Sequence, residues 1–244
     1  MSDTGLPPRR PGGPLTSRPL HFFWLADGSG SMRVEGKMQA LNQAIREAIP
    51  HMQGVARENP QAAVLVRALR FDNHARWLDQ RSTPVGDYHW NDMEAGGLSA
   101  LGQALRLVGD VLAAPERSEC LLPPVIALVT DGLPTDDIRA GLEYLMSKPL
   151  GQAALRLVIA IGEDAASNEA QEVFREFVAN DALQPFQANH PEALVESVRW
   201  VATAALQAVS SPACVFARAG SAPPLQPVLA AGGLNGGSGR ANVW

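Results

Sequence analysis

Oxygen-bearing side chains alternate with glycine in one short segment, which reads Asp27-Gly28-Ser29-Gly30-Ser31. The segment follows the apolar run 22–26, so it falls where a buried strand ends and a helix begins. Carboxylate and hydroxyl oxygens on a tight turn are ligands that Mg²⁺ and Mn²⁺ prefer. The spacing therefore favours a cation site at Asp27, Ser29 and Ser31, although the same residues could form a turn that caps the helix.

Two later segments place residues of the same kind after a strand or before a helix. Ser99 lies in the turn Gly96-Gly97-Leu98-Ser99 before an apolar-periodic helix, and Asp131 directly follows the apolar run 125–130. Alone, Ser99 would most simply cap its helix, and Asp131 would lie in a turn with Gly132. Together the segments predict one shared cation site, whose expected ligands are Asp27, Ser29, Ser31, Ser99 and Asp131.

In order and character, the three segments resemble the motifs of the von Willebrand factor A (VWA) domain, which builds a metal-ion-dependent adhesion site (MIDAS). The resemblance covers roughly residues 18–209. The third segment reads Thr130-Asp131-Gly132-Leu133-Pro134-Thr135-Asp136-Asp137 and is most similar to bacterial tellurium-resistance proteins of the TerY type.

The resemblance implies how the metal would be held. The serines of the first segment would ligate it directly, and so would Ser99 in the open form, at a position where the family usually has threonine. The two aspartates would act mainly through bound water. Family members use the remaining coordination position to bind an acidic residue of a partner protein, so the expected partner offers an Asp or Glu carboxylate to Mg²⁺ or Mn²⁺.

The implied function is that of a non-catalytic, metal-dependent protein–protein interaction module. The TerY-like wording implies a role in bacterial stress-response or conflict signalling, alongside a protein kinase and a phosphatase. Two alternatives stay open, a metal-dependent hydrolase or phosphotransferase and a metal-free VWA scaffold. Against an enzyme, the sequence has no G-x-S-x-G elbow and no P-loop lysine, and no second Asp lies two residues after Asp27.

Composition excludes several other classes. The chain has 244 residues, 46% of them hydrophobic and 18% charged, with a net charge of −5, which is ordinary for one α/β domain with tails. Without a dense Lys/Arg block, nucleic acid is not expected as a partner. Cys120 and Cys214 are too few for a disulfide framework or a zinc ligand set. With no secretory signal and no apolar run of membrane-spanning length, we expect a cytoplasmic protein without a membrane partner.

The elements that must position the site alternate along the chain. Helix-period segments separate apolar runs that predict strands at 21–26, 63–71, 75–78, 125–130, 155–161 and 184–187. This pattern predicts an α/β fold of the VWA or Rossmann-like kind, with a doubly wound, mainly parallel central sheet, helices on both faces and one antiparallel edge strand. Pro50 is expected to kink the first helix without ending it. Thr135, Asp136 and Asp137 are expected to cap the helix that follows them.

The expected domain limits are a disordered leader over 1–18, a VWA domain over 19–209 and a flexible Gly/Ala/Pro-rich tail over 210–244. Trp244 is either part of a dispensable tail or an anchor for a partner. The segment 84–94, which contains Trp90 and Asp92, precedes the Ser99 turn and could set partner choice at the metal rim. Trp90 could instead pack the core or cover a loop.

Overall fold

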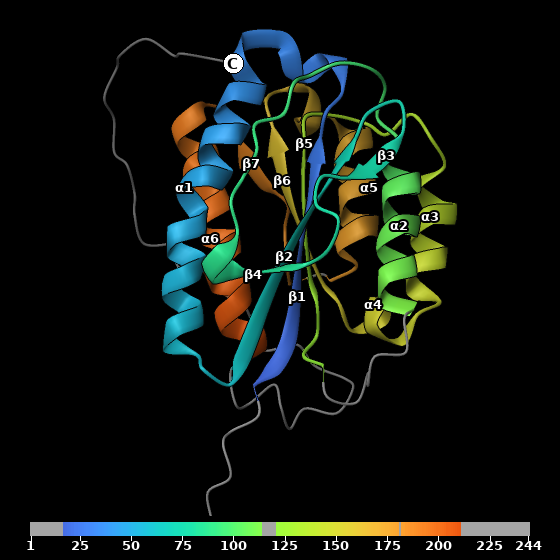
Figure 1. The fold of residues 1–244 in the computed structure, drawn as a ribbon. Coiled ribbons are helices and arrows are strands. Elements are labelled where there is room, and N and C mark those ends of the chain that lie inside the picture. Colours follow the sequence, from blue (N-terminus) through green and yellow to red (C-terminus); the bar gives the residue numbers. More distant parts are fainter. Residues whose placement is uncertain (1–16, 114–120, 181, 211–244) are drawn as a thin grey trace, which may run out of the picture.

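A computed structural model describes residues 17–113, 121–180 and 182–210 (Figure 1). The strands are β1 (Arg18–Asp27), β2 (Ala62–Phe71), β3 (Ala75–Trp77), β4 (Thr83–Pro84), β5 (Val125–Thr130), β6 (Leu155–Ile161) and β7 (Phe186–Ala188). The α-helices are α1 (Lys37–Glu58), α2 (Leu101–Ala113), α3 (Ile138–Met146), α4 (Pro149–Ala153), α5 (Asn168–Val178) and α6 (Pro191–Ser210). Short 3₁₀ segments are η1 (Gly30–Gly36), η2 (Val85–Asp87) and η4 (Asp164–Ala166).

The strands form one mixed sheet in the order β3-β2-β1-β5-β6-β7, with β4 also paired to β2. Strands β2, β1, β5, β6 and β7 run parallel, whereas β3 and β4 are antiparallel to β2. The predicted fold class is confirmed, and the second antiparallel strand, β4, was not predicted. The last strand covers Phe186–Ala188 rather than the predicted 184–187.

Helices cover both faces of the sheet (Figure 1): α1 and α6 pack together on one face, and α2, α3 and α4 lie on the other. All six residues of β5 are buried, as expected for a central parallel strand covered on both sides. Helix α1 continues through Pro50 to Glu58, so this proline does not end it.

The order of the strands reverses between β1 and β5. The chain passes from β1 to β2 on one side and from β5 to β6 on the other. Ala26 pairs with Val129, so the next residues, Asp27 and Thr130, end the two strands at the same height. In open α/β sheets, ligands bind beyond the carboxyl ends of the strands at such a reversal point.

Within the described ranges, no helix has both the length and the apolar content needed to cross a bilayer. The expected leader up to residue 16 and the expected tail from residue 211, with Trp244, lie outside the described residues, as do Cys120 and Cys214.

Candidate metal centre

Three loops meet beyond the carboxyl ends of β1 and β5. The first loop (28–36) follows β1, the second loop (95–100) precedes α2, and the third loop (131–137) follows β5. Together they carry every residue of the predicted cation site except Asp27, which ends β1 itself. The site is therefore built by segments that are far apart in the sequence.

Backbone hydrogen bonds join the first loop to the second. The Gly30 N–H donates to the Gly97 carbonyl oxygen at 2.9 Å, and the Gly96 N–H donates to the Gly28 carbonyl oxygen at 2.8 Å. Gly97 has a φ of +99°, a conformation that side-chain-bearing residues rarely adopt. The glycines of these loops thus allow the backbones of the first and second loops to lie in close contact beyond the strand ends.

The third loop is tied to the second by Thr135 and Asp136. The Thr135 N–H donates to the Ser99 carbonyl oxygen at 2.8 Å, and the Thr135 hydroxyl accepts from the Ser99 N–H at 3.0 Å. The carboxylate of Asp136 accepts two backbone N–H groups from the first turn of α2, at 2.8 and 2.9 Å. Only Asp137 caps the following helix, α3, by accepting from an N–H of its first turn at 3.0 Å. The expectation that all three residues cap α3 is wrong for Thr135 and Asp136.

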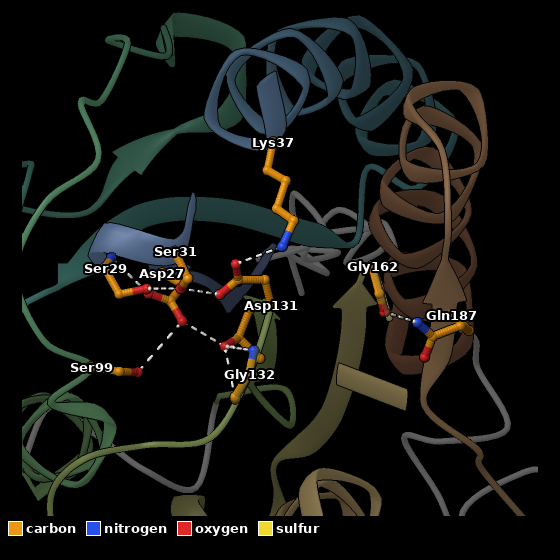
Figure 2. A network of polar contacts seen from close by, with 10 residues as sticks. Asp27, Ser29, Ser31, Lys37, Ser99, Asp131, Gly132, Gly162 and Gln187 are labelled. Carbon is orange, nitrogen blue, oxygen red and sulfur yellow. Dashed lines mark hydrogen bonds and ion pairs between the residues drawn. The ribbon is translucent and has the colours of Figure 1, made fainter. Parts of the chain in front are cut away.

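The carboxylate of Asp27 lies at the middle of the site (Figure 2). Its Oδ1 accepts the Ser29 N–H at 2.8 Å, while its Oδ2 accepts the Thr130 hydroxyl at 2.6 Å and the Ser99 hydroxyl at 3.4 Å. The Ser99 side chain is therefore directed at Asp27 rather than at the N–H groups of α2. Thr130 was not among the predicted site residues.

A second run of contacts links the remaining residues. The hydroxyls of Ser29 and Ser31 lie 3.0 Å apart, and the Ser31 hydroxyl donates to Oδ1 of Asp131 at 2.7 Å. The Lys37 ammonium contacts the other oxygen, Oδ2, of Asp131 at 3.0 Å. The structure thus brings the five predicted residues into one connected polar network, which Figure 2 shows from close by.

Most of this network is buried. Asp27 and Asp131 are each 1% exposed, whereas Ser31 is exposed and opens the site to solvent. Burial raises the pKa of Asp27 to about 6, against the opposing effect of hydrogen bonds from Thr130 and Ser29. Within the described part of the chain, no ion pair involves Asp27. Its carboxylate is therefore buried without a compensating positive charge.

Lys37 is the second site residue, after Thr130, that sequence reasoning missed. It is the first residue of α1, and its side chain is only 7% exposed. A Cβ added at Gly162 would lie 3.3 Å from its Cε, so this glycine leaves room for the lysine chain. A lysine in the first turn of a helix is unfavourable with respect to the helix dipole. This unusual position is the sequence signal that could have indicated a nearby acidic side chain, here Asp131.

The donor set fits a hard divalent cation. Adjacent ligands of an octahedral ion at 2.0–2.1 Å lie about 3 Å apart. The Ser29–Ser31 hydroxyl separation is 3.0 Å, and the Ser31 hydroxyl lies 2.7 Å from Asp131. Among the described residues, no group of three or more His, Cys, Asp and Glu gathers at one point, so the imidazole and thiolate sets of structural zinc sites do not occur there.

The segment expected to set partner choice lies against α1. Trp90 is 8% exposed, and its indole N–H donates to the side-chain oxygen (Oδ1) of Asn42 at 3.0 Å. Its ring therefore packs the segment onto the helix, which is the role that the sequence offered as the alternative to partner contact. Asp92 is exposed and forms an ion pair with Arg46 of α1.

No protein-family model and no curated protein matches this chain. Solved structures do match it. A von Willebrand factor type A structure from Catenulispora acidiphila matches with a TM-score of 0.58 and 16% identity, over 78% of this chain and 43% of that chain. The PilB minor pilin from Streptococcus sanguinis matches with a TM-score of 0.57 and 16% identity, over 82% of this chain and 64% of that one.

A third match is the proximal thread matrix protein 1 of the mussel byssus, whose structure has a zinc-occupied MIDAS motif. Its TM-score is 0.53 and its identity 13%, over 79% of this chain and 46% of that chain. The chain thus spans less than two thirds of each of these proteins. At such identities the comparison establishes the fold, which is that of VWA domains.

Proposed function

We propose that this chain is a metal-dependent protein–protein interaction module, in which Mg²⁺ or Mn²⁺ is held by Asp27, Ser29, Ser31, Ser99 and Asp131 and binds a carboxylate of a partner. The observation that carries the proposal is the environment of Asp27. Its carboxylate is buried at the end of a central strand and contacts neutral hydroxyl and N–H groups. A bound divalent cation would supply the positive charge that this carboxylate needs.

The charges of the site favour capture of one further carboxylate. Asp27, Asp131 and Lys37 together carry a net charge of minus one, so a divalent cation leaves the site with a net charge of plus one. Ser31 is exposed, which gives a partner access from that side. Truncating one member of a buried charge pair at an interface typically costs about 2–5 kcal/mol, so a single partner Asp or Glu would contribute much of the affinity.

Binding rather than catalysis is proposed because the hydroxyls of Ser29, Ser31 and Ser99 contact carboxylates or one another. None of them is hydrogen-bonded to a histidine or lysine base in the described residues. One observation favours the alternative of a metal-free scaffold: the Lys37 ammonium already pairs with Asp131 at 3.0 Å.

The TerY-like sequence of the third loop supports a cytoplasmic role in bacterial stress-response or conflict signalling, with a kinase and a phosphatase as associated proteins. This part of the proposal rests on the sequence resemblance alone. The zinc-occupied MIDAS motif of the mussel protein supports divalent metal binding on this fold.

Calorimetric titration of Mg²⁺ and Mn²⁺ into the metal-free full chain tests the proposal. Wild type should bind one equivalent, and Ser99→Ala should bind more weakly. Ser147→Ala is the matched control, because the Ser147 hydroxyl only caps the end of α3. Proteins that co-purify with wild type but not with Asp27→Ala, and that EDTA releases, are the expected partners. Absence of saturable binding of either ion would leave the metal-free scaffold.

A further inference from the structure

Three large apolar side chains are exposed within the described residues: Val34, Leu98 and Leu133, at 55%, 58% and 41%. Each belongs to a different loop of the candidate metal centre. Val34 is in the first loop, Leu98 immediately precedes Ser99 in the second, and Leu133 follows Asp131 by two residues in the third. Single exposed apolar residues are ordinary, but their confinement to the loops of one site is not. We call these three residues the apolar rim.

The rim residues belong to loops that are hydrogen-bonded to one another. The first and second loops share two backbone hydrogen bonds, one from Gly30 to Gly97 and one from Gly96 to Gly28. The second and third loops share the one from Thr135 to Ser99. The three exposed side chains therefore belong to loops that are joined to one another next to the Asp27 carboxylate.

The local backbone fixes Val34 and Leu98 in these positions. Val34 has a ψ of 140° at a break inside η1, and Glu35 and Gly36 follow it in left-handed conformations at φ 55° and 76°. The Leu98 N–H donates to the Asn73 side-chain oxygen at 3.0 Å. A non-glycine residue at positive φ is strained, and such strain gathers at functional sites. Here the strained residue, Glu35, directly follows Val34, whose exposed side chain contributes little to the core.

We propose that the apolar rim binds a partner-protein segment in which the captured Asp or Glu is flanked by large apolar side chains. The inference rests on the proposed function, since the carboxylate would bind at the centre of the rim. The two parts are complementary: the net charge of plus one selects the carboxylate, and the rim buries its apolar neighbours. At interface hot spots, the contacts that surround the central group exclude water from it.

Two blocked peptides test the rim against the full chain, with excess Mg²⁺ and with EDTA. One has the sequence Gly-Leu-Asp-Leu-Gly and the other Gly-Ser-Asp-Ser-Gly, and binding is measured by fluorescence anisotropy. Wild type should bind the leucine peptide at least about tenfold more tightly than the serine peptide, in Mg²⁺ only. Leu98→Ser should remove most of this preference, whereas Leu98→Met should keep it. Mg²⁺ affinity by calorimetry should be the same in both variants.

The outcomes separate this inference from the function on which it rests. Equal, Mg²⁺-dependent binding of both peptides overturns the rim and leaves carboxylate capture standing. Absence of Mg²⁺-dependent binding of either peptide overturns both. A leucine preference that persists in Leu98→Ser and in Val34→Ser also overturns the rim. Sedimentation velocity tests whether a second copy of this chain binds the rim instead. Mg²⁺-dependent dimerisation that Leu98→Ser abolishes would assign the rim to that second copy and overturn the partner segment.

Discussion

Two buried aspartates lie at neighbouring strand ends on the same side of the sheet, and they differ in whether a positively charged side chain pairs with them. Asp72 follows β2, and its carboxylate contacts Arg70 at 2.8 Å and Arg76 at 3.1 Å. Asp27 ends β1, the adjacent strand, and contacts hydroxyl and N–H groups instead. Both aspartates are buried, so both need compensation in the folded state.

The difference separates a structural platform, formed by Asp72, Arg70 and Arg76, from the candidate metal centre at Asp27. The Asp72 carboxylate is paired with positive charge from within the chain, and its cluster supports the loops above it: the Asp72 carbonyl oxygen accepts the Ala100 N–H at 3.0 Å, and the Arg70 side chain fills the space beside Gly28. The Asp27 carboxylate has no cation from the described chain. Asp131 is intermediate, since it pairs with Lys37 and a serine hydroxyl. In the proposed function, the metal would supply the positive charge that Asp27 lacks.

The largest expected effect is the loss of stability when the platform at Asp72 is removed. Asp72→Ala leaves the Arg70 guanidinium, 14% exposed, without its partner, and removal of one member of a buried pair costs about 3–5 kcal/mol. Urea unfolding of the metal-free chain measures the loss. Asp92→Ala is the control, because its ion pair with Arg46 is exposed and should contribute less than about 1 kcal/mol. Equal losses in the two variants would contradict the assignment of Asp72 as the platform.

The second prediction concerns pH. Because the pKa of Asp27 is raised from 3.8 to about 6, folding favours its protonated form. Metal-free wild type should therefore lose stability relative to Asp27→Asn as the pH rises from about 4 through 6, by about 2–3 kcal/mol in total. Urea unfolding of both proteins over this pH range gives the difference. A constant difference would mean that the burial of Asp27 carries no penalty for its charge.

The third prediction is the response to metal. At a Mg²⁺ concentration about one hundred times its Kd, wild type should gain about 2.7 kcal/mol, or roughly 5–11 °C in Tm. Asp27→Asn should show no such gain, because its amide cannot balance the cation. Thermal unfolding with Mg²⁺ and with EDTA measures both. A full gain in Asp27→Asn would move the metal away from the centre of the site.

The sequence predicted the central strands because their apolar runs are continuous, and β5 and β6 span the predicted residues. It missed the first part of β1, where Arg18 and Pro19 pair with β2 without an apolar pattern. The two-residue strand β4 carries no pattern at all. Where periodicity is absent, pairing is decided by the tertiary fold.

At the site, sequence reasoning selected oxygen-bearing side chains at strand ends and before a helix, and the structure brings these side chains together. It did not identify Lys37 or Thr130, because their roles depend on contacts 94 and 103 residues away. Asp136 shows the same limit. Its position before α3 predicts a cap for that helix, yet it binds N–H groups of α2, more than thirty residues earlier in the chain.

The fourth prediction asks how far Lys37 supplies charge to the site. Lys37→Met should raise the Mg²⁺ affinity about tenfold, or about 1.4 kcal/mol, because the ammonium no longer competes for Asp131. Lys148→Met is the control, since Lys148 stacks on the Tyr144 ring far along the chain. Calorimetry measures both affinities. A lower affinity in Lys37→Met would show that the lysine organises the site rather than competing with the metal.

The smallest expected effect distinguishes two adjacent helix caps. Asp136→Ala and Asp137→Ala each remove one cap, so each should lower the free energy of unfolding by about 1 kcal/mol. Of these two carboxylates, only that of Asp136 joins the third loop to the first turn of α2, next to Ser99, so only Asp136→Ala should also weaken Mg²⁺ binding, by a few-fold. Asp137→Ala is its matched control, because its cap is local to α3. If both variants bind Mg²⁺ as wild type does, the position of the Ser99 hydroxyl does not depend on the Asp136 contacts, and the hydrogen bonds of Thr135 to Ser99 and of Asp72 to Ala100 set the geometry of the site.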